Sequence, residues 1–69
     1  MTTVTVNGER RELPDGATIE TTVRDLGAPD RGVAVAVDGE VVPRGDWAST
    51  PMRDGQQVEV LRAVQGGGR

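Results

Sequence analysis

The sequence of 69 residues contains no cysteine, no histidine and no lysine. Without cysteine and histidine, the common zinc sites and the Cys-His and Ser-His nucleophilic arrangements are excluded. Without lysine, Schiff-base chemistry and the phosphate-binding loop that ends in Gly-Lys-Ser/Thr are excluded as well. Because only carboxylates, arginines and hydroxyls are left for acid-base chemistry, we expect that the chain by itself is not an enzyme.

Aromatic residues are nearly as scarce, since the chain has no phenylalanine, no tyrosine and a single tryptophan, Trp47. Hydrophobic residues make up 35% of the chain, and most of the large ones are valines. This length and composition predict one domain with a small aliphatic core. We expect Trp47 to cap that core, because one large ring buries about 150 to 250 Å².

The chain also lacks any concentration of positive charge. Its net charge is -3, its pI is about 4.7, and its eight arginines are scattered. This distribution argues against binding to nucleic acid, which requires a basic patch. No apolar stretch is long enough for a membrane span or a secretory leader, so we expect no membrane association and a cytoplasmic location. The Asp-Gly pairs are too sparse for a calcium loop, and we expect no metal site.

The chain begins with a predicted hairpin. Residues 3–13 contain alternating apolar and polar side chains around Asn7-Gly8, a dipeptide typical of two-residue hairpin turns. The second strand of this hairpin is so polar that we expect it at an edge of the sheet.

A helix is predicted between Thr18 and Gly27. Thr18 is suited to the N-cap and Glu20 to the first turn, while Gly27 ends the helix. Three apolar residues recur at the spacing of one helical face: Ile19, Val23 and Leu26. Packing of this face against a sheet must supply most of the stability of so short a helix.

The second half of the chain reads as another hairpin and a last strand. Residues 33–42 surround the turn dipeptide Asp38-Gly39, with valines on one face of the first strand and alanines on the other. A loop that contains Trp47 follows, and the last strand is expected from Val58 to about Val64.

This order of elements predicts an α+β fold of the β-grasp (ubiquitin-like) type. It has a mixed sheet of four to five strands with one main helix packed on one face. The valine-rich first and last strands should pair in the middle of the sheet. The β-grasp domain then spans residues 1–64, and a flexible glycine-rich tail spans residues 65–69.

The tail contains three consecutive glycines, at 66–68, before Arg69. Glycine has no Cβ, so this backbone fits through a slot too narrow for other residues. From Val64 the chain to Gly67 spans at most about 10 Å. Such a tail can enter the active site of another protein while the folded domain stays outside.

These motifs resemble those of the ubiquitin-like sulfur carrier proteins, most closely the ThiS family of thiamine biosynthesis. The resemblance covers nearly the whole chain and rests on VNGE at 6–9, LPDGAT at 13–18, GVAVAVDGEVVPR at 32–44 and AVQGG at 63–67.

The resemblance implies that the chain is a protein co-substrate of partner enzymes. In such carriers an E1-like adenylating enzyme, which uses ATP and magnesium, activates the carboxylate of the terminal glycine. Sulfur from a cysteine persulfide displaces AMP, and thiazole synthase consumes the resulting thiocarboxylate. The match to AVQGG makes Gly66 and Gly67 the diglycine, with Gly67 carrying the adenylate and then the thiocarboxylate. ATP and magnesium are therefore expected on the activating enzyme, and no cofactor on this chain.

Gly68 and Arg69 depart from this family pattern, because adenylation requires a free α-carboxylate on Gly67. We expect that a protease trims both residues, unless they are an addition to the natural sequence. Removal of Arg69 alone is a further alternative.

The residues that precede the diglycine are candidates for partner docking: Leu61, Arg62, Ala63 and Gln65. Leu61 and Ala63 could form an exposed apolar patch with Ala34 or Ala36. Alternatively, they belong to the second face of a covered strand. Arg62 lies close to the tail and could pair with an acidic residue of a partner.

Other functions stay open from the sequence. A related carrier would deliver sulfur to molybdopterin or cysteine synthesis. A ubiquitin-like modifier would attach its tail to other proteins, although without lysine it could not build lysine-linked chains on itself. A plain β-grasp interaction module would have an inert tail.

Overall fold

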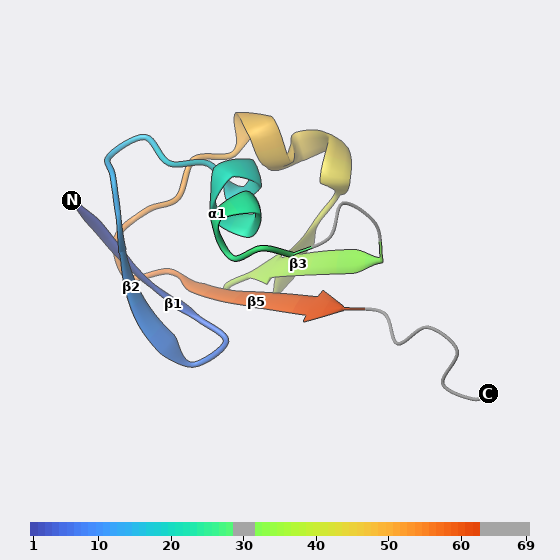
Figure 1. The fold of residues 1–69 in the computed structure, drawn as a ribbon, viewed down its shortest axis with the longest axis horizontal. Coiled ribbons are helices and arrows are strands. Elements are labelled where there is room, and N and C mark those ends of the chain that lie inside the picture. The colour runs from blue at the N-terminus through green and yellow to red at the C-terminus, as the bar shows by residue number, and fades with distance from the viewer. Residues whose placement is uncertain (29–31, 63–69) are drawn as a thin grey trace.

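The computed structural model describes residues 1–28 and 32–62. These residues form a mixed five-stranded sheet of order β2-β1-β5-β3-β4, with one α-helix packed on one face (Figure 1). The elements in chain order are β1 (Thr2–Val6), β2 (Glu9–Leu13), α1 (Ile19–Asp25), β3 (Val33–Val37), β4 (Glu40–Val42), the 3-10 helix η1 (Arg44–Ser49) and β5 (Gln57–Arg62). The β-grasp prediction is confirmed.

The two hairpins turn at the predicted dipeptides. Asn7 and Asp38 both have φ of 51°, and the glycines that follow, Gly8 and Gly39, have φ of 82° and 85°. Two successive positive φ values are the mark of a type I′ turn, whose twist matches that of the flanking strands. The polar strand β2 lies at an edge of the sheet, as expected.

β5 is the central strand of the sheet and lies beside β1, as the sequence predicted. It runs parallel to β1, with Val58 opposite Val6, and antiparallel to β3, with pairs from Val33↔Arg62 to Val37↔Val58. β5 is described as far as Arg62. The predicted extension to Val64 and the predicted tail at 65–69 lie outside the described residues.

Helix α1 begins and ends with side-chain and backbone caps. The Thr18 hydroxyl accepts a hydrogen bond from the Thr21 N–H at 3.3 Å, and the Thr21 hydroxyl accepts one from the Thr18 N–H at 3.0 Å. This is a capping box. At the other end, Gly27 has φ of 74° and the Ala28 N–H donates to the Val23 carbonyl at 3.3 Å. Thr18 and Gly27 thus have the predicted roles.

The segment around Trp47 was expected to be a loop, and this expectation was wrong, because it forms η1. The Trp47 side chain is only 5% exposed, and its indole N–H donates to the Val42 carbonyl at 2.9 Å. Burial of this ring holds the segment against the core and favours a compact helical turn. The predicted role of Trp47 as a cap over the core is confirmed.

The core lies between the sheet and the layer of α1 and η1 (Figure 1). Its buried hydrophobic residues are Val4, Val6, Leu13, Ile19, Val23, Val35, Trp47, Met52, Val58 and Val60. No helix within 1–28 and 32–62 is long and apolar enough to cross a membrane.

Candidate functional site

The two faces of the sheet differ in what covers them. Helices α1 and η1 pack on one face, and no element of the described residues covers the other (Figure 1). Successive side chains of a strand point to opposite faces. On β5, Val60 is therefore 8% exposed in the core, whereas Leu61 is 60% exposed on the opposite face.

Apolar side chains gather on this helix-free face. Leu61 lies opposite Ala34 on β3, and Val41 on β4 lies opposite Ala36. Ala34 and Ala36 are two residues apart on one strand and so point to the same side. Together Ala34, Ala36, Val41 and Leu61 form what we call the helix-free patch. Among the described residues, Val41 at 69% and Leu61 at 60% are two of the three exposed large hydrophobic side chains.

The structure therefore exposes Leu61 in the way the patch hypothesis requires, and it adds Val41, which the sequence analysis missed. A signal for Val41 was present. A two-residue turn at Asp38-Gly39 places Val41 opposite Ala36, so the two side chains must share a face.

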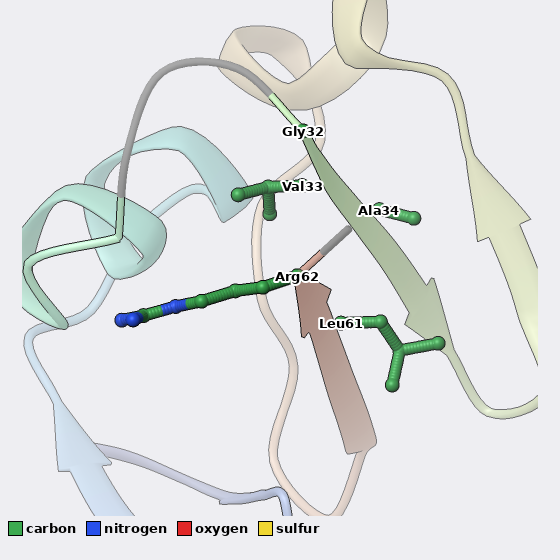
Figure 2. Close-up of a pocket in the computed structure, with 5 residues that line it drawn as sticks. All are labelled: Gly32, Val33, Ala34, Leu61 and Arg62. Atoms are coloured by element: carbon green, nitrogen blue, oxygen red, sulfur yellow. The ribbon is translucent and has the colours of Figure 1, made fainter. Parts of the chain in front are cut away.

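The end of β5 forms the border of a second feature, an open hollow of about 320 Å³ lined by Gly32, Val33, Ala34, Leu61 and Arg62. Figure 2 shows Leu61 and Ala34 projecting to one side of the paired strands, and Val33 and Arg62 to the other. The candidate docking residues Leu61 and Arg62 thus belong to different faces. The Arg62 side chain is exposed on the side of α1.

The other predicted site residues lie outside the described part of the chain: Ala63, Gln65, Gly66 and Gly67. Within the described part, no group of three or more Asp and Glu side chains is placed to hold a metal ion. The described part of the candidate site therefore consists of the helix-free patch and the end of β5 at Arg62.

The comparisons with known proteins agree with this architecture. A sequence model of the ThiS family matches residues 4–67. The sulfur carrier protein ThiS of Thermus thermophilus is 38% identical over 64 residues, which cover 93% of this chain and 98% of that protein. The crystal structure of the thiamine biosynthesis protein ThiS from Geobacter metallireducens has a TM-score of 0.78 at 27% identity, and the match covers 97% of this chain and 100% of that one.

A thiazole synthase of Paramagnetospirillum magneticum is 34% identical over 62 residues, which cover 90% of this chain but only 19% of that protein. A segment similar to this chain therefore occurs inside a much longer protein. Because the family model spans residues 4–67 and the Thermus relative is matched almost end to end, this chain belongs to the ThiS family.

Proposed function

We propose that the chain is a sulfur carrier protein, which supplies sulfur for thiazole formation in thiamine biosynthesis. The observation that carries this function is the match to the ThiS family, which runs through AVQGG and ends at Gly67. The β-grasp domain and the relative named sulfur carrier protein ThiS support it.

The reactive group is the α-carboxylate of Gly67. A carboxylate is a poor electrophile until one of its oxygens becomes part of a leaving group. An E1-like partner therefore uses ATP and magnesium to form the Gly67 acyl-adenylate with release of pyrophosphate. A persulfide sulfur on a partner then displaces AMP to form an acyl disulfide. A partner thiol attacks the donor-side sulfur of this disulfide, which forms a new disulfide on the partner side and releases the Gly67 thiocarboxylate. The Gly66-Gly67 backbone has no side chain to hinder either attack.

The chain acts as a co-substrate and its partners supply the catalytic groups. Thiazole synthase is the second partner, and a natural protein of that name that contains a carrier-like segment supports this pairing. The helix-free patch docks the partners. Arg62, Ala63 and Gln65 contact them next to the tail, which enters the active site of the partner. All of these steps take place in the cytoplasm.

Intact-mass spectrometry tests the function. Chains that end at Gly67 and at Arg69 are incubated with a ThiS-activating enzyme, ATP, magnesium, a persulfide donor and a thiol that cleaves the acyl disulfide. The chain ending at Gly67 should gain the mass of one sulfur-for-oxygen replacement, and the longer chain should stay unchanged. A chain ending at Gly66 is the matched control for the position of the carboxylate.

Two results would contradict the proposal. If no form of the chain gains sulfur, it is not a carrier of this kind, and covalent adducts with other proteins would identify a modifier. If the chains ending at Gly67 and Arg69 react equally, Gly67 is not the required end. A trimming protease is then unnecessary.

A further inference from the structure

The central strand β5 depends on different partners along its two flanks. On one flank β3 pairs with it as far as Arg62. On the other flank the register with β1 ends at Val6↔Val58, because the chain turns away at Asn7-Gly8. If β1 paired only through its backbone, the last residues of β5 would therefore have no pairing partner on this flank.

The side chain of Asn7 occupies this opening. Its Oδ1 accepts a hydrogen bond from the Val60 N–H at 2.8 Å, and its Nδ2 donates to the Val60 carbonyl at 3.2 Å. The Asn7 backbone N–H donates to the Val58 carbonyl at 2.9 Å. One residue thus makes three hydrogen bonds to β5, and two of them reach Val60.

These bonds continue the parallel ladder by one peptide group. In a parallel pair, a residue donates its N–H to one partner residue and accepts from the residue two positions further on. The N–H of Asn7 donates to Val58, so its backbone carbonyl would accept from Val60 if the strand continued. Because Asn7 has φ of 51° and leaves the strand, its carboxamide oxygen accepts that bond instead. The carboxamide NH₂ stands in for the next backbone N–H.

The other hairpin turn makes an equivalent contact at the start of β5. The Asp38 N–H donates to the Gln57 carbonyl at 2.7 Å, and the Asp38 Oδ1 accepts from the Gln57 N–H at 2.9 Å. Asp38 also has φ of 51°. The two turns are therefore alike in conformation, but Asp38 holds the beginning of β5, and Asn7 holds Val60, close to its end.

We propose that Asn7 is a positioning residue for the reaction at the C-terminal diglycine, an inference that rests on the proposed sulfur-carrier function. Val60 is the last residue of β5 that is held on both flanks. Without Asn7, the anchor on this flank retreats from Val60 to Val58. The end of β5 would then be held by β3 alone, as far as Arg62. Asn7 thus restrains the direction of the strand end from which a docked carrier presents Gly67.

The test compares Asn7→Gly with Asp38→Gly in the form of the chain that the activating enzyme accepts. Glycine tolerates the positive φ at both turns, so each variant loses side-chain bonds and keeps its hairpin. Hydrogen exchange of the Val60 amide should become about tenfold faster in Asn7→Gly and should change little in Asp38→Gly.

Adenylation kinetics give the decisive measurement. In Asn7→Gly we expect kcat to fall about threefold to tenfold, with KM for the carrier near that of the wild type, because docking persists while presentation of the carboxylate is impaired. Asp38→Gly should retain the wild-type kcat. Asn7→Asp, which keeps the acceptor but not the donor, should be intermediate.

Two outcomes overturn the inference: an Asn7→Gly kcat equal to that of the wild type, or equal losses in Asn7→Gly and Asp38→Gly, which would indicate a general effect on stability. Failure of the sulfur-carrier function itself is distinguishable, because the wild-type chain would then gain no sulfur in the intact-mass experiment.

Discussion

Val60 and Leu61 are neighbours on β5 whose side chains point to opposite faces of the sheet. Truncating each side chain in turn therefore distinguishes an effect on folding stability from an effect on partner docking. Burying a whole leucine side chain contributes about 1.5 to 3 kcal/mol, so Leu61, at 60% exposed, contributes about 1 kcal/mol. In a domain of this size, 1 kcal/mol shifts Tm by about 4 to 8 °C. Leu61→Ala should therefore lower Tm by no more than about 8 °C. Val60→Ala removes buried atoms, costs about 2 kcal/mol and should lower Tm by about 8 to 16 °C.

The effects on partner binding should have the opposite order. The assay is run at a temperature well below the Tm of both variants. Leu61→Ala should then raise the KM of the activating enzyme for the carrier about fivefold or more, since it removes an apolar anchor from the helix-free patch. Leu61→Asp should raise KM further, because an unpaired carboxylate resists burial in the complex. Val60→Ala should leave KM near the wild-type value.

Thermal unfolding followed by circular dichroism, together with adenylation kinetics, makes this comparison. If Leu61→Ala lowers Tm as much as Val60→Ala does, Leu61 contributes to the core and our assignment of the two sheet faces is wrong. If both Leu61 variants keep the wild-type KM, the helix-free patch does not dock the activating enzyme.

Three further predictions test the patch, the tryptophan cap and the helix cap. Val41→Asp should raise KM with little change in Tm, and an unchanged KM would limit the docking surface to β3 and β5. Trp47→Phe removes the donor to the Val42 carbonyl and should lower the free energy of unfolding by about 2 kcal/mol in urea titrations; an unaltered midpoint would refute this role of the indole. Thr18→Ala should cost about 1 kcal/mol and Thr18→Ser much less, as measured by the same titrations, and equal losses would argue against the hydroxyl as the cap.

Much of the fold was predictable because its signals are local. Asn7-Gly8 and Asp38-Gly39 each join two strands in the expected register, because Asn, Asp and Gly tolerate the positive φ that both turn positions require. The limits of α1 were predictable for the same reason, from a hydroxyl at one end and a glycine at the other. The 3-10 helix was not, because it depends on burial of Trp47 against a core assembled from distant strands.

The candidate site was also predictable only in part from the sequence. The exposure of Leu61 was one of two interpretations that the sequence allowed, and the choice required knowledge of which face α1 covers. Arg62 was predicted to contact partners because it lies close to the tail, yet strand alternation places it on the opposite side of the sheet from Leu61 (Figure 2). The roles of Ala63, Gln65, Gly66 and Gly67 remain predictions from the sequence.

The sequence by itself determined the turns, the helix limits, the absence of cysteine, histidine and lysine, and the diglycine motif. The absences follow from composition alone, and each of the other features depends on the identity of a few adjacent residues. Only the tertiary structure decided which sheet face is open and that the Asn7 carboxamide reaches Val60, 53 positions along the chain. Such contacts arise from the pairing of the first and last strands, and local conformational preference carries no information about distances between segments so far apart in sequence.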